Sequence, residues 1–316
     1  MIDAGPRGIV PRLCLNHFGV REIEALIVSH NDDDHWGGAV QIIQKYPRNI
    51  RNLYFLEDRP NPRNRLLDIV QREVAEENLP QPKRLEADST EGKCLFRDED
   101  RAVSLHVLFP WMLANIDARN AGGSNKTSAV LALQCGRKRI LFGGDLGIEG
   151  WRQLRGALKR PILCTVLAVP HHGGGVATVD QAENHRWMYK EAVRCDFAII
   201  SVGTANQYGH PRADHVRALR EAGATILCTQ ITDRCCSASV LETLRPGVIT
   251  PSVPGASSAK EQKTSSARRS KNVACAGSIL AEIGPDHLRL HRLGDHQGAV
   301  DDLASRPDGH PLCREP

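Results

Sequence analysis

The chain has 316 residues, of which 41% are hydrophobic and 25% are charged, a globular composition that excludes a collagen-like or wholly disordered chain. The formal net charge of +4 permits an anionic substrate without requiring one. No apolar run approaches the roughly 18 residues of a membrane-spanning helix, and no secretory signal pattern opens the chain. Ten cysteines without such a signal predict a reducing environment, so we expect a cytoplasmic protein that does not associate with membranes.

Short β-rich runs alternate with amphipathic helical patterns over about the first 240 residues. The expected strands are 25–29, 53–56, 104–109, 128–134, 139–143, 164–169, 197–202 and 225–228, and the expected helices are 38–45, 65–77, 147–158, 179–194 and 212–222. Only four residues separate strands 128–134 and 139–143, which predicts an antiparallel hairpin. The pattern therefore favours a mixed α/β (α+β) fold over a doubly wound parallel sheet.

The composition changes after these elements. Pro, Ser, Ala, Lys and Arg dominate residues 244–272, which predicts a flexible insertion. Two strand-like runs follow at 276–283 and 288–293, and residues 294–316 are expected to form a disordered tail. We therefore expect one catalytic domain over residues 1–293, with the insertion inside it and no second domain.

The most informative segment joins the first expected strand to the first expected helix. Two histidines and three aspartates fall within six residues there: His30, Asp32, Asp33, Asp34 and His35. Neutral imidazole and carboxylate are the usual protein ligands of divalent metals. Five such groups at one strand-to-helix junction are hard to explain by turn chemistry, so this cluster predicts a metal site.

Three later strands are also followed by Asp or His. Asp145 follows the apolar run 140–142, His171 and His172 follow strand 164–169, and His210 comes after strand 197–202. Any one of these alone would be interpreted as a turn residue or a buried histidine. Their repetition at strand ends, where loops gather at one rim, predicts that they share a site with the first cluster.

The order and spacing of these motifs resemble the metallo-β-lactamase superfamily and, within it, the ComEC-like branch, the soluble hydrolase domain of bacterial competence (DNA-uptake) channels. The matching motifs are Ile2-Asp3-Ala4-Gly5-Pro6, Ser29-His30-x-Asp32-x-Asp34-His35-x-Gly37-Gly38, Asn125-x-x-Ser128, Gly144-Asp145, His171-His172-Gly173 and Ser201-x-Gly203-x-x-Asn206-x-Tyr208-Gly209-His210-Pro211. The resemblance extends from the first residue to about residue 230. It implies a four-layer αββα sandwich. Because relatives carry two strands before the position of the first motif, we expect this chain to lack the first β-hairpin.

The resemblance also implies a site for two divalent metal ions. The implied ligands are His30, Asp32, His171 and bridging Asp145 for one metal, and Asp34, His35, His210 and the same Asp145 for the other. The usual superfamily motif has His where this chain has Asp32, and Asp is familiar there in the ComEC-like branch. Because the extra carboxylate makes the site more anionic, Zn²⁺ is the first expectation and Mn²⁺ or Mg²⁺ are alternatives.

Catalytic and substrate-binding roles follow from two-metal hydrolysis, in which the cations lower the pKa of a shared water toward about 7. Asp34 is expected to orient the resulting hydroxide, and His172, next to the preferred ligand His171, to hydrogen-bond the substrate or support the ligands. The residues expected to contact substrate are Asn125, Lys126 and Ser128, which offer an amide, a cation and a hydroxyl to a phosphate, and Ser201, Asn206 and Tyr208 in the His210 motif. The alternative for the segment 125–128 is ordinary turn chemistry before a strand.

The cysteines allow a second metal site. Cys228, Cys235, Cys236 and Cys275 would come together for a structural Zn²⁺ if residues 244–272 loop out. The spacing is not that of a paired zinc knuckle, and buried unreactive thiols are the alternative.

We therefore predict a metal-dependent hydrolase, specifically a phosphodiesterase or nuclease that acts on DNA or RNA. One alternative is a hydrolase of small esters, thioesters or phosphoesters, because this fold serves many reactions. Another is a subunit of a multi-protein system, such as a defence system, whose activity depends on protein partners. A nuclease should lose activity steeply with salt, whereas a small-ester hydrolase should not.

Overall fold

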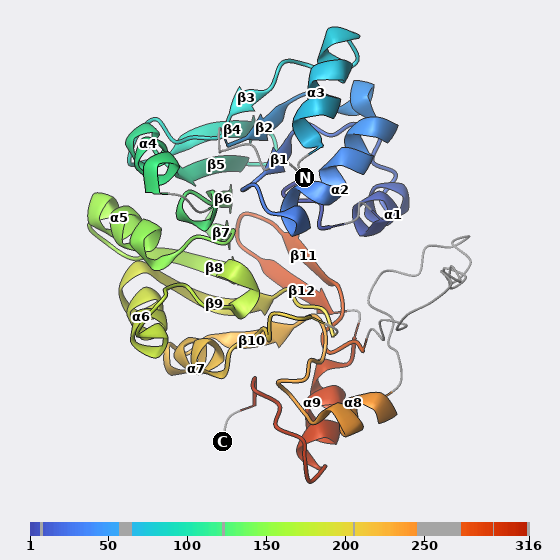
Figure 1. The fold of residues 1–316 in the computed structure, drawn as a ribbon, viewed down its shortest axis with the longest axis vertical. Helices are drawn as coiled ribbons and strands as arrows, with labels where there is room; N and C mark the ends of the chain where they lie inside the picture. Colours follow the sequence, from blue (N-terminus) through green and yellow to red (C-terminus); the bar gives the residue numbers. More distant parts are fainter. Residues whose placement is uncertain are drawn as a thin grey trace. The chain divides into compact units, whose positions relative to one another are not determined.

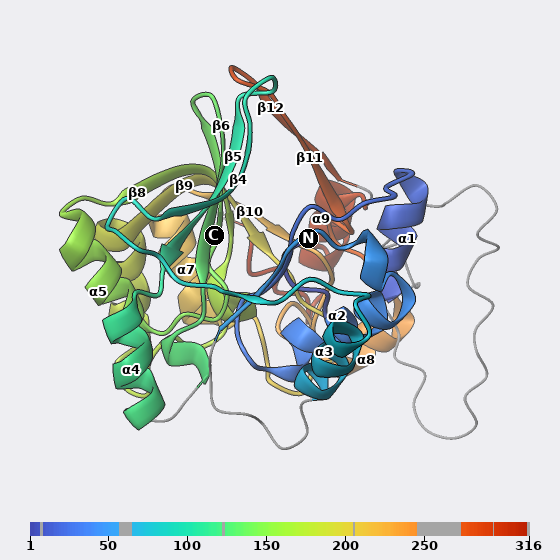
Figure 2. The ribbon, with the colours of Figure 1, turned by 90° about the horizontal axis from the view of Figure 1, so that it is seen from above.

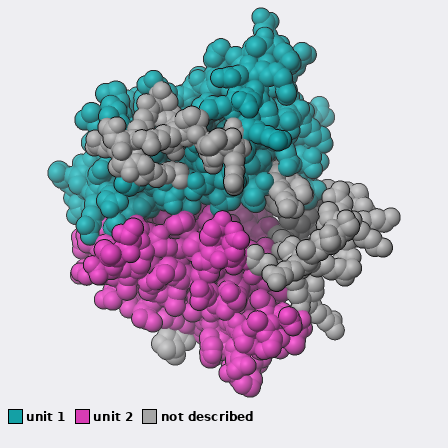
Figure 3. All heavy atoms as spheres, viewed as in Figure 1, with its two compact units in different colours: residues 1–161 teal, residues 162–316 magenta. Residues whose placement is uncertain are grey.

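The computed structural model describes residues 1–6, 9–56, 65–121, 124–204, 206–244, 273–292 and 294–314. The chain divides into two compact units, Met1–Pro161 (unit 1) and Ile162–Pro316 (unit 2), shown in different colours in Figure 3. In the described ranges no helix is both long enough and apolar enough to cross a membrane. The predicted flexible insertion lies, apart from Leu244, outside the described residues. A single domain over residues 1–293 stays a prediction.

Unit 1 begins with a parallel sheet that carries the first motif. Its strands lie in the order β1 (Leu26–Val28), β2 (Leu53–Phe55) and β3 (Lys83–Arg84), and Ile2 adds a parallel bridge to Ile27. Helices α1 (Ile9–His17), α2 (Asp33–Lys45) and α3 (Leu66–Ala75) and the 3₁₀ turn η1 (Pro47–Asn49) accompany this sheet. Their core joins Leu26 of β1 to Ile42 and Ile43 of α2, all fully buried, so the strand and helix that flank the metal motif are packed together.

Helix α2 starts five residues before the predicted helix 38–45. Asp33 and Asp34 occupy its first turn, where negative side chains interact favourably with the positive end of the helix dipole. The motif therefore does not form an open loop. His30 and Asp32 lie between β1 and α2, whereas Asp34 and His35 belong to the helix itself.

The N-terminal motif packs closely against α2. The Gly38 N–H donates to the Gly5 carbonyl over 2.6 Å, and a Cβ atom at Gly38 would overlap the carbonyl of Ala4. At Gly37 a Cβ would lie 2.7 Å from the Pro6 carbonyl oxygen. The two glycines are therefore required by the approach of one backbone to another.

The second part of unit 1 is an antiparallel meander, visible edge-on in Figure 2. Strands β4 (Lys93–Asp98), β5 (Val103–Phe109), β6 (Val130–Cys135) and β7 (Lys138–Phe142) pair in sequence order, and the predicted hairpin is the β6–β7 pair. Helix α4 (Met112–Ala121) and the 3₁₀ turn η2 (Ser124–Lys126) connect β5 to β6, and α5 (Ile148–Leu158) follows β7. The turn between β7 and α5 carries Asp145.

Unit 2 contains a parallel three-stranded arrangement, β10 (Thr225–Cys228), β9 (Val193–Ile200) and β8 (Ile162–Ala168), in that order (Figure 1). The 3₁₀ turn η3 (Pro170–Gly173) follows β8, α6 (Gln181–Trp187) and the π-helical turn η4 (Met188–Ala192) precede β9, and α7 (Ala213–Glu221) precedes β10. The short helix α8 (Ala238–Thr243) and the antiparallel pair β11 (Ile279–Ile283) and β12 (Leu288–Arg292) complete this part. The mixed α/β fold class is thus confirmed, with parallel and antiparallel strands in one chain.

The prediction that residues 294–316 form a disordered tail is wrong for the first part of this segment. Residues His296–Ala304 form helix α9, and the Asp295 side chain caps it by accepting a hydrogen bond from the Gly298 N–H. Val300 and Leu303 are buried at 5% and 1% exposure, so apolar spacing outweighs the polar composition on which the prediction rested.

Candidate metal centre

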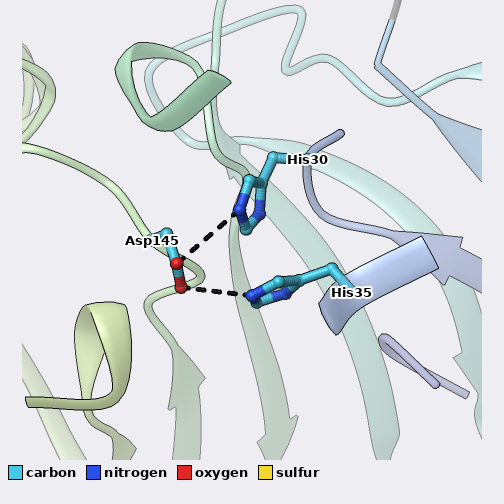
Figure 4. Close-up of side chains that lie close together, drawn as sticks. All are labelled: His30, His35 and Asp145. Carbon is cyan, nitrogen blue, oxygen red and sulfur yellow. Dashed lines mark ion pairs between the residues drawn. The ribbon is translucent and has the colours of Figure 1, made fainter. Parts of the chain in front are cut away.

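Two histidines of unit 1 face one aspartate. His30 Nε2 lies 3.6 Å from Asp145 Oδ2, and His35 Nε2 lies 3.4 Å from Asp145 Oδ1, as Figure 4 shows. All three side chains are buried, and the two imidazole rings are 3.9 Å apart between centroids. Each oxygen of one carboxylate is therefore directed at a different histidine.

The two aspartates of the first motif each face a different histidine, as the two oxygens of Asp145 do. Asp32 Oδ2 lies 3.4 Å from His30 Nε2, and Asp34 Oδ2 lies 3.8 Å from His35 Nε2. Both carboxylates are about half exposed, in contrast to the buried Asp145. The structure thus brings together all five predicted ligands of unit 1, in the two groups that the resemblance implies, with Asp145 common to both.

The Nδ1 atoms of both rings, opposite the Nε2 atoms that face Asp145, are held by the polar side chains of Asp3, Ser29 and Ser128. His35 Nδ1 donates to Asp3 Oδ2 over 2.8 Å, and Asp3 also accepts from the Ser29 hydroxyl and the Ser29 N–H, both over 2.7 Å. His30 Nδ1 lies 3.1 Å from Ser29 Oγ and 3.2 Å from Ser128 Oγ. With each Nδ1 engaged, each Nε2 is the nitrogen that faces the carboxylates, which is how metal-binding histidines are usually oriented.

Sequence reasoning missed Asp3 as a functional residue. The Ile2-Asp3-Ala4-Gly5 motif could have pointed to Asp3, but it was used only for the family resemblance, and no role was assigned to the Asp3 carboxylate. Burial raises the pKa of Asp3, yet the neighbouring His35 and the Ser29 N–H outweigh that effect and hold the pKa below its usual value. Asp3 is therefore a partly buried negative charge that fixes the orientation of His35.

The surroundings of His35 favour a positive charge. Burial lowers its pKa, but the nearby Asp3 and Asp145 carboxylates overcome burial and raise the pKa of His35 to about 11. His30 Nε2 is buried and makes no hydrogen bond among the described residues. Two imidazoles and three carboxylates that converge in this way fit divalent cations, which would neutralise the carboxylates and satisfy the ring nitrogens.

Ser128 is not placed to contact substrate, contrary to prediction. Its side chain is fully buried, and its Oγ accepts the Asp145 N–H over 2.7 Å while bonding His30 Nδ1. One hydroxyl therefore connects the bridging aspartate to a histidine. The positive φ of Gly144, where a Cβ would overlap Ser128 Oγ, permits this close approach.

Replacing Ser128 with alanine should loosen both ligands at once. We expect metal affinity and turnover to fall by about 10–100-fold, the usual cost of losing an outer hydrogen-bond partner of a metal ligand. Titration of the metal-depleted protein with Zn²⁺ or Mn²⁺ measures the affinity. Ser124→Ala, in the turn before β6, provides the matched control; equal affinity in the two variants would contradict the role of Ser128.

The other predicted substrate residues of unit 1 lie beside the Asp145 turn. The Asn125 carbonyl accepts the Gly147 N–H over 3.1 Å, which ties η2 to the residues that follow Asp145. Lys126 is exposed and Asn125 is half-buried. An amide and an ammonium group are thus held on a turn bonded to the Asp145 loop, and their contact with a phosphate stays a prediction.

The adjacent histidines of unit 2 have different partners. His171 Nδ1 donates to the Gly175 carbonyl over 2.7 Å, and its ring lies 5.2 Å from the His210 ring between centroids. His172 Nδ1 donates to the Ser201 carbonyl over 2.9 Å. The structure therefore places the His171 ring beside the ring of His210, the other predicted histidine ligand of this unit.

Polar residues of the His210 motif mainly stabilise their own loop. The Asn206 side chain donates to the carbonyls of Gly203 and His210 and accepts the His210 N–H, so it holds the loop, which does not fit the predicted substrate contact. Ser201 contributes its backbone carbonyl to His172. Tyr208 is 72% exposed, and its ring stacks over His210 at 5.9 Å and 22°, so it stays a candidate for substrate contact.

A buried histidine pair supports the turn that carries His171. His215 Nδ1 donates to the Gly174 carbonyl over 2.7 Å, His185 Nε2 approaches the same oxygen at 3.2 Å, and Tyr189 donates its hydroxyl to His215 Nε2. Burial, helped by repulsion from His185, lowers the pKa of His215 to about 3. His215 is therefore neutral in the folded protein over most of the pH range.

This burial predicts acid sensitivity in unit 2. The unfolded chain takes up a proton at His215 near pH 6.5, whereas the folded chain does so only near pH 3. Stability is therefore expected to fall as the pH drops through this window, by about 1.4 kcal/mol per pH unit at most. Urea unfolding of wild type and His215→Phe at pH 7 and pH 5 measures the effect. The variant should lose less stability between the two pH values, and equal losses would contradict the assignment.

Comparison with known proteins is in accord with the motifs and the fold. Residues 1–97 match the family model of the metallo-beta-lactamase superfamily. Competence protein ComA of Neisseria gonorrhoeae is 28% identical over 236 residues, which cover 73% of this chain and 27% of the relative. ComE operon protein 3 of Bacillus subtilis (strain 168) is 26% identical over 227 residues, which cover 71% of this chain and 25% of the relative. The chain thus spans about a quarter of the length of these curated relatives.

Among solved structures, CmlA, a diiron beta-hydroxylase from Streptomyces venezuelae, aligns with a TM-score of 0.42 and 12% identity, covering 65% of this chain and 43% of that chain. That similarity is too low to indicate function. The family model, the two relatives and the motifs agree on the same assignment. Residues 1–97 are therefore similar to the metallo-β-lactamase superfamily, and most of the chain is similar to part of the two ComEC-like relatives.

Proposed function

We propose that this chain is a two-metal phosphodiesterase that cleaves nucleic acid. The observation that carries the proposal is the division of the Asp145 carboxylate between His30 and His35, each of which also faces its own aspartate. One carboxylate shared by two otherwise separate ligand groups is the arrangement expected for a bridging ligand of two cations. His171 and His210 of unit 2 are proposed to complete the two groups.

The chemistry of the site divides between the metals and the chain. When bound, two divalent cations would lower the pKa of a shared water and stabilise charge on phosphate oxygens. Asp34 would accept a hydrogen bond from the attacking water and so orient it. The Asn125 amide and Lys126 ammonium, on a turn bonded to the Asp145 loop, would hold a non-bridging phosphate oxygen. His172, whose Nδ1 is held by the Ser201 carbonyl, would present Nε2 to the leaving group or the substrate.

Three observations support a nucleic acid as the substrate. One curated relative is a competence protein by name, and the motifs of this chain resemble the ComEC-like branch, the hydrolase domain of bacterial competence (DNA-uptake) channels. The net charge of +4 suits a polyanion. The exposed Lys126 and the exposed Tyr208 ring offer a phosphate contact and a base-stacking surface, respectively.

A substrate panel tests the proposal. Metal-loaded protein is incubated with single- and double-stranded DNA, RNA, bis(p-nitrophenyl) phosphate, a thioester and a β-lactam, in Zn²⁺ or Mn²⁺. We expect DNA or RNA cleavage that weakens steeply between about 50 and 200 mM salt. Salt-insensitive turnover of the thioester or β-lactam alone would instead assign a small-molecule hydrolase, and loaded protein that leaves every phosphodiester intact would refute the proposal.

A pair of neighbouring aspartates supplies the matched control. Asp34→Asn removes a carboxylate that faces His35, whereas Asp33→Asn removes the same charge from the exposed preceding position of α2. Cleavage should be lost in the first variant and kept within a few-fold in the second. Equal activities would exclude Asp34 from the site.

A further inference from the structure

Four cysteines and one histidine of unit 2 lie close together where three distant parts of the chain meet. Cys228 ends β10, Cys235 follows seven residues later, and Cys275 precedes β11. Cys313 lies near the C-terminus, and His296 is the first residue of α9. Cys228, Cys235, Cys275 and His296 are all no more than 9% exposed.

Backbone hydrogen bonds hold these segments together. The Ala276 N–H donates to the Cys228 carbonyl over 2.8 Å, and the Cys275 N–H donates to the Thr229 carbonyl over 3.1 Å. The His310 N–H donates to the Cys235 carbonyl over 2.6 Å, which brings the segment containing Cys313 to the same place. The thiols are therefore gathered by the fold of the main chain.

Cys275 and His296 are the most closely placed pair. Cys275 Sγ lies 3.0 Å from His296 Nδ1, and the imidazole also hydrogen-bonds the backbone of Ile226. A hydrogen bond from the ring to the backbone is typical of histidines in metal sites, because it fixes the orientation of the imidazole. In His296, Nδ1 faces the sulfur of Cys275.

The pKa shifts of the thiols indicate which cysteines are neighbours. Burial raises the pKa of Cys228 and Cys275 well above the usual range and that of Cys313 to about 11. Repulsion from Cys235 adds to the increase in all three, so Cys235 is the common neighbour. These shared effects place Cys228, Cys275 and Cys313 around Cys235, in agreement with the backbone hydrogen bonds.

We propose that this Cys/His cluster, made of Cys228, Cys235, Cys275, Cys313 and His296, is a structural site for Zn²⁺ or a similar thiophilic cation. Four of the five residues ligate the cation tetrahedrally, and Cys235, Cys275 and His296 are three of the four. The cation replaces the protons of the ligating thiols, which pass to solvent. In the described residues no three ligand atoms of the cluster lie within 4.8 Å of one another, so rotation about the Cα–Cβ bonds draws the sulfurs together.

The structure places Cys313, instead of the predicted Cys236, among the cysteines of this cluster. The sequence groups Cys236 with Cys228, Cys235 and Cys275. In the structure the neighbours of Cys236, besides the adjacent Cys235, are Arg306 and Asp233, and its backbone pairs with Gly309. Cys313 takes its place because the C-terminal segment returns past Cys235. The bound cation would fasten that segment, and α9 through His296, to the end of β10, so its binding energy would stabilise unit 2.

Cobalt substitution tests this site separately from the candidate metal centre, which contains no sulfur. Reduced, metal-free protein is loaded with Co²⁺ in an Asp145→Asn background, in which the unit 1 cluster is impaired. We expect sulfur-to-cobalt charge-transfer absorption in the near ultraviolet and about one tightly held Zn²⁺ per chain after zinc reconstitution. Both should disappear in Cys275→Ser and Cys235→Ser and remain in Cys164→Ser, a buried thiol of β8 in the same unit.

Absence of the charge-transfer band, or its survival in Cys275→Ser and Cys235→Ser, would overturn the site, and its loss in Cys236→Ser would overturn the ligand set. If the cysteine variants do not fold, a stoichiometric mercurial added to zinc-loaded Asp145→Asn protein decides the question. Release of about one Zn²⁺ as the thiols react supports the site, and no release overturns it. Neither readout depends on hydrolytic activity.

Discussion

Replacing Asp145 with asparagine should abolish hydrolysis and remove the metal bound by unit 1. The amide keeps the shape of the side chain but loses the charge that both histidine groups share through Oδ1 and Oδ2. The loss should therefore exceed the about 10–100-fold effect of removing an outer partner such as Ser128. Metal analysis of the purified variant and its rate of phosphodiester cleavage, each relative to wild type, measure the two consequences.

The control for this variant is Glu149→Gln, which removes an exposed carboxylate from the first turn of α5, four residues away. It should bind metal and turn over substrate as wild type does. A variant Asp145→Asn that is folded and still holds the full wild-type metal content would show that the carboxylate does not bridge two cations.

The second large effect is expected from Gly38→Ala. A Cβ atom there would overlap the Ala4 carbonyl, and the close backbone bond from the Gly38 N–H to Gly5 leaves the segment no room to retreat. Because the obstacle is backbone, we expect a loss of about 3 kcal/mol or more in the free energy of unfolding. Asp3 lies on the displaced segment, so activity should fall as well.

Gly156→Ala is the matched control, since it makes the same change in a helix. Gly156 is exposed in α5, and its Cβ would meet nothing within 4 Å. Alanine there should stabilise the protein by about 0.5–1 kcal/mol through helix propensity. Denaturant unfolding of both variants gives opposite signs if the packing argument holds, and two similar values would contradict it.

The sequence predicted most elements of the first 230 residues because their buried faces repeat with a clear period. Helices α1 and α4 were missed, since α1 contains Pro11 and α4 exposes Met112 and Leu113 at 57% and 69%. Neither helix has the simple amphipathic pattern that local rules detect. The start of α2 was placed late for a similar reason, because the metal-binding motif itself forms the first turn.

The side chains that converge on Asp145 could be predicted from the motifs, but the partners of the neighbouring serine and asparagine side chains could not. Serine and asparagine can serve a substrate or the main chain with the same hydroxyl or amide, and only burial decides between the two. Ser128 is fully buried on the Asp145 N–H, and Asn206 is used by the His210 loop. The choice of Cys313 over Cys236 likewise depends on a return of the chain across more than 70 residues, which no local spacing reveals.

The residues that hold His30 and His35 come from widely separated places in the sequence, from Asp3 at one end to Asp145 at the other. A partly folded chain offers only the local motif, without the shared carboxylate and without the groups that orient the rings. Tight loading of the two proposed metals would therefore be a late event in folding, and it would depend on the integrity of the whole first unit. A nascent or damaged chain would bind cations weakly, which would prevent the proposed hydrolysis before the fold is complete.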